Sequence, residues 1–238
     1  MLKSAKNLYF AQINQVDKKM TDIIKVSQLT KKFKLKKTGG GLKSFFHPEY
    51  KSLTAVDKIS FSIAKGERVA FIGPNGAGKS TTIKMLSSIL YPTSGHAEVM
   101  GLIPWENRQK LAYNIGTVFG QRSQLWYNLP VQDSFALFGK MYNLDEIKFK
   151  RRLSRLVKLF EIRDLLSHPT RSLSLGQRMR CEIVASLIHN PQVLFLDEPT
   201  IGLDVTAKEI IRSLIKKQAL EEETTLLLDR KSIRLNSS

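Results

Sequence analysis

The sequence predicts an α/β fold with a mainly parallel sheet, an antiparallel β subdomain and an inserted helical subdomain. Continuous apolar runs of strand length occupy residues 69–72 and 193–196, and such runs are typical of parallel strands buried on both faces. Apolar and polar residues alternate over 56–63, which indicates a half-buried strand. Apolar residues spaced three and four apart over 131–142 and 149–160 predict amphipathic helices.

The predicted elements can be placed in order along the chain. A strand is expected at 23–29, and the glycines and proline of 38–48 predict a long loop. The remaining expected elements are strands at 55–63 and 69–72, a helix from 82 that ends at the turn 91–95, strands at 98–100 and 115–119, helices at 131–142, 149–160 and 178–188, a strand at 193–196, a helix at 205–217 and a strand at 224–228. Because helical patterns interrupt the series of strands, we expect a helical insert at about 122–190.

Composition and charge limit the classes of partner. The 238 residues include 38 Lys and Arg against 21 Asp and Glu, a formal charge of +17, which indicates an anionic partner such as a nucleotide, a nucleic acid or a membrane surface. Lysines crowd the segment 31–51, where we favour a solvated basic loop over a lipid or nucleic-acid patch. The single cysteine, Cys181, excludes an internal disulfide and is interpreted as a small buried hydrophobe. No apolar run reaches the length that spans a bilayer, so we expect membrane attachment to come through a partner.

A phosphate-binding motif follows the strand at 69–72. Gly73, Gly78, Lys79 and Ser80 fill the pattern G-x-x-x-x-G-K-[ST] between a predicted strand and a predicted helix, which is the context that the motif requires. The loop N–H groups would face phosphates, Lys79 would add charge for the β- and γ-phosphates, and Ser80 would bind Mg²⁺. The alternative, a glycine-rich turn that only reverses the chain, leaves the lysine and serine unexplained. The sequence therefore predicts a P-loop NTPase core with the nucleotide-binding residues Gly73, Pro74, Asn75, Gly76, Ala77, Gly78, Lys79, Ser80 and Thr81.

Two acidic residues follow the apolar run at 193–196. A phosphate loop needs an acidic strand end that positions Mg²⁺, so we expect Asp197 to hold the metal through water. Glu198 is the candidate catalytic base that orients and deprotonates the attacking water. The alternative is a solvated turn, which the phosphate loop upstream disfavours.

A serine- and glycine-containing turn at 173–177 stands between these two motifs. Its sequence, Leu-Ser-Leu-Gly-Gln, resembles the Leu-Ser-x-Gly-Gln signature of the ATP-binding cassette (ABC) family and occurs in that family's order, after Lys79 and before Asp197. Taken alone, the turn is an ordinary helix N-cap. The resemblance covers about residues 23–228, and the runs at 90–95, 120–126 and 175–182 are most similar to ATPase subunits of the daunorubicin and viologen exporters.

The resemblance implies roles for further residues. Gln121 is similar to the Q-loop glutamine, which implies a catalytic role and a place among the Mg²⁺ ligands. Asp204 lies in a segment similar to the D-loop. Phe33 falls where the family places an aromatic residue that stacks on adenine, although it could equally be a core residue.

The resemblance also implies partners and a mechanism. ATP would be bound between two nucleotide-binding domains, identical or different, arranged head to tail, so that Ser174, Gly176 and Gln177 contact the ATP on the other chain's phosphate loop. Binding would close this dimer and hydrolysis would release it. The Gln121 region and the helical insert would pass the motion to membrane-spanning permease subunits, which places the protein peripherally on the cytoplasmic face of the cell membrane. Trp126 and Tyr127, just beyond Gln121, are candidates for the docking surface, and core positions are the alternative.

Two other functions compete with a transporter ATPase, in particular an exporter. A soluble cassette ATPase acting on ribosomes or nucleic acid fits the positive charge, but the spacing from Lys79 to Ser174 is that of a compact helical insert, so no stable nucleic-acid partner is expected. A regulatory cassette that binds ATP without hydrolysing it is disfavoured by Glu198.

The two ends of the chain depart from the family pattern. We interpret residues 1–19 as an extension, with the hypothesis that translation starts at Met20, residues 20–228 as the nucleotide-binding domain, and 229–238 as an artefactual tail similar to a translated sequencing adapter. The family's histidine after the strand at 224–228 is replaced by the sequence Asp-Arg-Lys-Ser. We therefore expect impaired hydrolysis, and apolar sheet edges left open by missing strands.

Overall fold

The computed structural model describes residues 9–12, 21–36, 50–120 and 122–229. The larger sheet has the strand order β1-β4-β8-β7-β6. Its strands are β1 (Tyr9–Gln12), β4 (Arg68–Ile72), β8 (Thr225–Asp229), β7 (Val193–Asp197) and β6 (Ile115–Phe119). The pairs from β4 to β6 are parallel and β1 is antiparallel to β4. The second sheet is antiparallel in the order β3-β2-β5, with β2 (Asp22–Lys36), β3 (Tyr50–Ala64) and β5 (Ser94–Val99).

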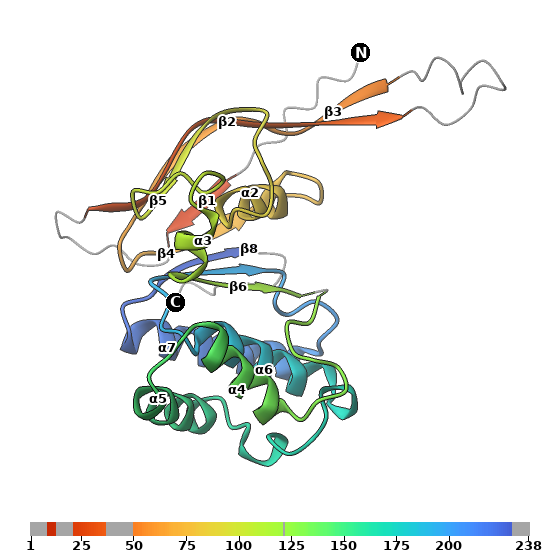
Figure 1. The fold of residues 1–238 in the computed structure, drawn as a ribbon. Helices are drawn as coiled ribbons and strands as arrows, with labels where there is room; N and C mark the ends of the chain where they lie inside the picture. The colour runs from red at the N-terminus through yellow and green to blue at the C-terminus, as the bar shows by residue number, and fades with distance from the viewer. Residues whose placement is uncertain (1–8, 13–20, 37–49, 121, 230–238) are drawn as a thin grey trace.

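The helices form layers on the two faces of the larger sheet (Figure 1). They are α2 (Lys79–Leu86), α3 (Arg108–Ala112), α4 (Val131–Met141), α5 (Glu146–Leu159), α6 (Leu175–Leu187) and α7 (Val205–Glu221), with short 3-10 turns at Arg163–Leu165 and Thr170–Ser172. The antiparallel sheet, α2 and α3 lie on one side, and α4 to α7 lie on the other. The predicted α/β class, with a parallel sheet, an antiparallel sheet and helices between β6 and β7, is confirmed.

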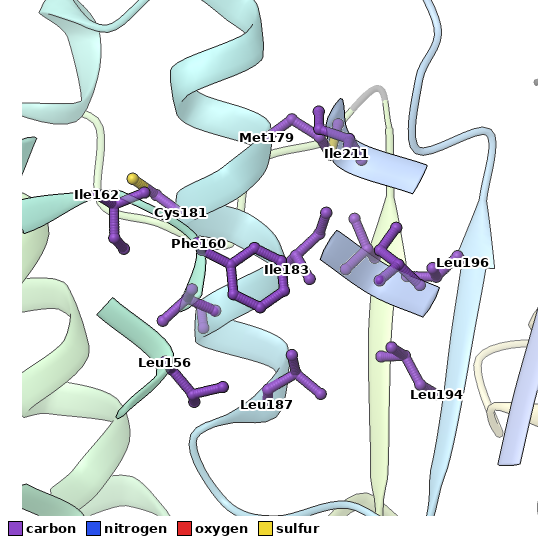
Figure 2. Packing of buried hydrophobic residues seen from close by; sticks show 14 of the residues in the cluster. Leu156, Phe160, Ile162, Met179, Cys181, Ile183, Leu187, Leu194, Leu196 and Ile211 are labelled. Carbon is purple, nitrogen blue, oxygen red and sulfur yellow. The ribbon is translucent and has the colours of Figure 1, made fainter. Parts of the chain in front are cut away.

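The side chains of β7 show why its sequence is apolar throughout. Leu194 and Leu196 pack into the cluster on the α6 side of the sheet (Figure 2), whereas Val193 and Phe195 belong to the cluster on the α2 side. Alternate residues of a strand face opposite sides, so a strand between two helical layers needs apolar residues at every position. Each fully buried side chain of this size contributes about 1.5–3 kcal/mol to stability. Cys181 lies in the same α6-side cluster, where burial raises the pKa of its thiol to about 12, in agreement with its interpretation as a small hydrophobe.

Several boundaries differ from the sequence prediction. Strands β2 and β3 are 15 residues each, because each continues past the core and pairs with the other in a protruding ribbon (Figure 1). Helix α2 ends at Leu86, well before the turn at 91–95. Helix α6 begins at Leu175 rather than at 178, since the turn at 173–177 is itself its first turn. The loop predicted at 38–48 lies wholly within the segment 37–49, outside the described residues.

Strand β1 was not predicted, because residues 1–19 show no clear periodicity. It pairs with β4 from Tyr9 opposite Ile72 to Gln12 opposite Val69. Strand β8 lies inside the sheet, between β4 and β7. The expectation of an open edge is therefore wrong beside β4, where four residue pairs of an antiparallel ladder cover that edge.

An ion cluster fastens α5 to α7 and α6. Arg152 donates to both carboxylate oxygens of Glu222, at 2.9 and 2.8 Å, and to the Leu187 carbonyl at 2.8 Å. Arg155 forms ion pairs with Glu221 and Glu222. Burial lowers the pKa of Arg152 to about 10. Because bidentate, partly buried pairs are stronger than exposed ones, this cluster holds the inserted helices against the core.

Candidate functional site

The phosphate loop leaves β4 and runs directly into α2. Gly78 is the N-cap of α2 with φ of 88°, and a Cβ added there would lie 2.4 Å from the Ala55 carbonyl oxygen of β3. No other residue type fits, because the conformation is left-handed and the space is filled by backbone. Gly76 is also left-handed, with φ of 75°. The loop therefore turns tightly and presents the α2 N-terminus, where amide groups favour anions.

Lys79 is a buried cation that spans the loop. Its side chain is 5% exposed, and its ammonium donates to the carbonyls of Gly73 at 2.9 Å and Pro74 at 3.1 Å. The same nitrogen lies 3.6 Å from Oδ1 of Asp229, a buried carboxylate at the end of β8. A buried charge needs such partners, and they hold the lysine over the loop.

Ser80 and Asp197 meet across the site. The Ser80 hydroxyl donates to Oδ1 of Asp197 at 2.6 Å, which joins the first turn of α2 to the end of β7. Burial raises the pKa of Asp197, while the hydrogen bond from Ser80 and the positive charge of Lys84 oppose the rise. A hydroxyl and a carboxylate oxygen side by side are hard oxygen donors of the kind that Mg²⁺ prefers.

Glu198 follows Asp197 in a left-handed conformation with φ of 51°. Its carbonyl lies so close to Gly120 that a Cβ on that glycine would be 2.3 Å from the Glu198 oxygen. The Gly120 amide donates to the Asp197 carbonyl at 3.0 Å. A left-handed non-glycine residue persists only when its surroundings fix it, and here the end of β6 provides that support.

These residues line a pocket of about 700 Å³. The lining residues are Asn75, Gly76, Gly78, Lys79, Ser80, Thr81, Lys84, Ile89, Phe119, Gly120, Arg122, Asp197, Glu198, Ile201 and Asp229. The fold thus brings six of the nine predicted phosphate-loop residues and both acids of 197–198 into one pocket. Sequence reasoning did not assign Lys84, Arg122 or Asp229 to the site. It expects a strand at 224–228 and a tail from Asp229 onward, whereas in the structure Asp229 is the buried last residue of β8. In parallel sheets the carboxyl ends of neighbouring strands meet at one edge, where ligands bind.

Of the predicted phosphate-loop residues, Gly73, Pro74 and Ala77 do not line this pocket. Phe33 is not among its lining residues either. Phe33 lies half-buried on β2, with the ammonium of Lys31 5.3 Å from its ring centre and Leu53 of β3 opposite. Gln121 lies outside the described residues, between Gly120 and Arg122, which both line the pocket.

The turn at 173–177 forms a separate, self-contained unit. Ser174 is the N-cap of α6: its hydroxyl accepts from the Gln177 amide at 3.2 Å, and the Gln177 side chain accepts from the Ser174 amide at 2.9 Å. This reciprocal pair is a capping box. Asp204 is the N-cap of α7, where its side chain accepts from the backbone amide of Ala207 at 2.8 Å. A Cβ on Gly176 would contact Ala207 at 3.6 Å, so the two helix starts lie together.

Comparison with known proteins assigns the chain to a family. A family model described as ABC transporter matches residues 56–201. The chain belongs to this family. It is 34% identical to the ABC transporter ATP-binding protein NatA of Bacillus subtilis over 181 residues, which cover 76% of this chain and 74% of NatA. It is 35% identical to the daunorubicin resistance ATP-binding protein DrrA3 of Streptomyces coeruleorubidus, over 70% of this chain and 54% of DrrA3. The match to YbhF of Escherichia coli spans one third of that protein, 33% of its length.

Solved structures agree with the family assignment. The ABC transporter subunit cbiO1 from Clostridium perfringens has a TM-score of 0.70 and 28% identity, covering 87% of this chain and 78% of that one. The ATP-binding cassette MJ0796, solved as a dimer with ADP and phosphate, has a TM-score of 0.69 and 26% identity over 87% of each chain. This ABC chain is therefore an ATP-binding domain of an ATPase family. Within its described residues, no helix is both long and apolar enough to cross a membrane.

Proposed function

We propose that this chain is the ATP-hydrolysing subunit of an ABC exporter and works as a head-to-tail dimer of nucleotide-binding domains. The observation that carries the proposal is the Ser80–Asp197 hydrogen bond of 2.6 Å beside Lys79. It assembles the phosphate-binding and metal-binding halves of one pocket from residues 117 positions apart. Such an arrangement suits phosphoryl transfer, in which positioning and charge stabilisation supply most of the catalysis.

Each predicted site residue has a separate task. The loop amides and Lys79 bind the β- and γ-phosphates. Ser80, Asp197 and Gln121 would hold Mg²⁺, which neutralises phosphate charge when bound. Glu198 receives the proton of the attacking water, and its fixed left-handed backbone directs the side chain from the end of β7. Phe33, on β2, would stack on adenine.

The turn at 173–177, hereafter the signature turn, would contact the ATP bound to the partner chain. Ser174, Gly176 and Gln177 form the first turn of α6, and Asp204 stands beside it at the start of α7. These residues do not line the pocket of their own chain. A helix N-terminus with a hydroxyl at its cap is suited to a γ-phosphate, and the second chain supplies that phosphate in a head-to-tail dimer. The dimeric state in which MJ0796 was solved supports this proposal.

Export through a membrane partner is the second half of the proposal. Relatives of the chain include proteins named for daunorubicin resistance, linearmycin resistance and Nod factor export. Trp126 and Tyr127 are 39% and 61% exposed, and the ring centre of Trp126 lies 5.4 Å from that of Phe138 on α4. Trp126 is thus both packed and accessible. We propose that this surface docks permease subunits at the cytoplasmic face of the membrane.

The experiment is nucleotide binding combined with a measurement of mass. Fluorescent ATP should bind the chain in the presence of Mg²⁺, and light scattering should show the mass of a dimer when hydrolysis is blocked by Glu198→Gln. Lys79→Ala should weaken binding about 10- to 100-fold, because hydrogen bonds to charged groups contribute about 1.5–3 kcal/mol. Binding that Lys79→Ala leaves unchanged would refute the pocket, and a mass that stays monomeric with bound ATP would refute the dimer.

A further inference from the structure

Glu182 is a buried carboxylate outside the nucleotide pocket. It lies on α6 and is 3% exposed. Its oxygens accept hydrogen bonds from the Ser123 hydroxyl and from the backbone N–H of Gln124. The Gln124 nitrogen lies 2.9 Å from Oε2 and 3.2 Å from Oε1. Burial raises the pKa of this carboxyl, and the hydrogen bonds from Ser123 and Gln124 oppose the rise. A buried ionisable group without a place in the pocket needs another explanation.

The partners of Glu182 belong to the loop that leaves the pocket. Arg122, which lines the pocket, directly precedes Ser123. The Gln124 side chain donates to the Thr117 carbonyl of β6 at 2.5 Å, and the Ser123 hydroxyl also contacts the Leu125 carbonyl at 3.2 Å. The segment 122–125 is thus fixed to β6 on one side and to α6 on the other.

The same helix begins at the signature turn. Glu182 stands eight positions after the N-cap Ser174, about 12 Å along α6 at 1.5 Å per residue. Helix α6 is continuous between them. A displacement of the segment 122–125 is therefore transmitted through one rigid helix to the residues that cap it.

We propose that Glu182 is a positioning residue that couples the pocket segment 122–125 to the signature turn, so that the two move as one unit. The inference rests on the proposed function, in which the signature turn binds the ATP of a second chain. Glu182 touches no reacting atom. It acts by holding the α6 N-terminus in a fixed relation to the pocket of its own chain, which makes closure on the partner's ATP responsive to this chain's own nucleotide.

Three substitutions separate coupling from simple packing. Glu182→Leu keeps the volume and removes both acceptors. Glu182→Gln keeps both hydrogen bonds but reverses one: its carbonyl oxygen accepts from the backbone amide of Gln124, and its NH2 group donates to the Ser123 hydroxyl, which can then donate to the Leu125 carbonyl. The matched control is Ser186→Ala, one turn further along α6, where a buried hydroxyl donates to the Ile183 carbonyl of the same helix at 2.7 Å.

Three quantities are measured for each variant: hydrogen exchange, ATP-dependent dimerisation and the affinity for ADP. Hydrogen exchange of the Gln124 amide in the nucleotide-free chain should accelerate about tenfold in Glu182→Leu, because its acceptor is gone, and should stay unchanged in Ser186→Ala. In the Glu198→Gln background, Glu182→Leu should weaken ATP-dependent dimerisation about tenfold, a typical size for coupling between sites. The affinity of the monomer for ADP should be unchanged. Glu182→Gln should restore both exchange and dimerisation to within about twofold of the parent.

The outcomes separate this inference from the function on which it rests. A Glu198→Gln chain that forms no dimer with ATP would refute the proposed function. If that dimer forms equally well with Glu182→Leu, or if Gln124 exchange is unchanged, the coupling is wrong. If Glu182→Leu lowers the affinity for ADP as well as dimerisation, and Glu182→Gln restores neither, then Glu182 only maintains the fold. That result would overturn the proposal.

Discussion

The nucleotide pocket and the signature turn use polar side chains in opposite ways. In the pocket, Ser80 bonds to Asp197 from a different element, and Lys79 reaches Asp229 on a third. In the signature turn, Ser174 bonds to Gln177 three residues away, within one helix start. The pocket therefore exists only in the assembled fold, whereas the turn is complete locally. We infer that the pocket is built to hold its ligand within one chain, and that the turn is a preformed surface for a ligand carried by another.

The most severe test of this contrast concerns Glu198, the proposed catalytic base of the pocket. Glu198→Gln should lower the ATP turnover number about 10³-fold, since general base catalysis contributes about 10²- to 10⁴-fold. Nucleotide affinity should be retained, because the amide keeps the shape of the side chain. Steady-state phosphate release and equilibrium binding measure the two effects. Unchanged turnover would show that another group accepts the proton.

The buried His189 tests whether contacts between distant elements also contribute to the free energy of unfolding. The Nε2 of His189 donates to the Ile115 carbonyl of β6 at 2.9 Å, and its ring stacks on Tyr142 of the loop after α4 at 4.0 Å. In the described structure its Nδ1 has no hydrogen-bond partner. Burial, helped by the charge of Arg152, lowers the pKa of His189 to about 4 from 6.5.

The sign of the pH effect follows from that depressed pKa. Above pH 6.5 the imidazole is neutral in both states, and the stability is fully present. As the pH falls from 6.5 to 4 the unfolded chain binds a proton that the folded chain does not, so the free energy of unfolding drops by about 3 kcal/mol, at about 1.4 kcal/mol per pH unit. In His189→Gln the part of this drop that comes from the histidine should be absent. Urea titrations of both chains at pH 7 and 4.5 measure the free energy of unfolding and its change with pH. An identical pH dependence in both chains would contradict it.

The Ser80–Asp197 contact can be tested by a double-mutant cycle. Ser80→Ala and Asp197→Asn should each weaken the affinity for ATP in the presence of Mg²⁺. Together they should weaken it by less than the sum, with an interaction of about 1–2 kcal/mol, because contacting residues couple by about 0.5–3 kcal/mol. Titration calorimetry with Mg²⁺ measures each corner of the cycle. Strict additivity would mean that the two side chains act independently.

The smallest expected effect concerns the local cap. Ser174→Ala should lower the free energy of unfolding by about 1 kcal/mol, the usual contribution of an N-cap. Ser174→Asp keeps the cap but adds a negative charge, so it should preserve stability while preventing ATP-dependent dimerisation. Thermal unfolding and light scattering separate the two roles. If Ser174→Asp dimerises like the parent in the Glu198→Gln background, the turn does not face a phosphate.

Prediction from sequence succeeded where a structural feature depends on residues close in sequence, or on an apolar pattern that repeats along one strand or helix. The continuous apolar run of β7 reflects burial on both faces, and β6 was placed at its observed bounds, 115–119. Prediction failed for the long ribbon of β2 and β3 and for β1, because strand pairing depends on a partner distant in the chain. Trp126 shows an intermediate case, since its ring packs on Phe138 and is also partly exposed.

The sequence by itself determined the glycines at 76 and 78, the cap of Ser174 with Gln177, and the order of motifs that identifies an ABC ATPase. These features depend on the backbone conformation of single residues or on side chains within four residues of one another. Such local relations can be read directly from the sequence. Only the tertiary structure decided that Asp229 approaches Lys79, that β1 covers the edge of β4, and that Glu182 holds Ser123 across 59 residues. Such contacts follow from strand order and helix packing, which bring distant residues together after the local elements have formed.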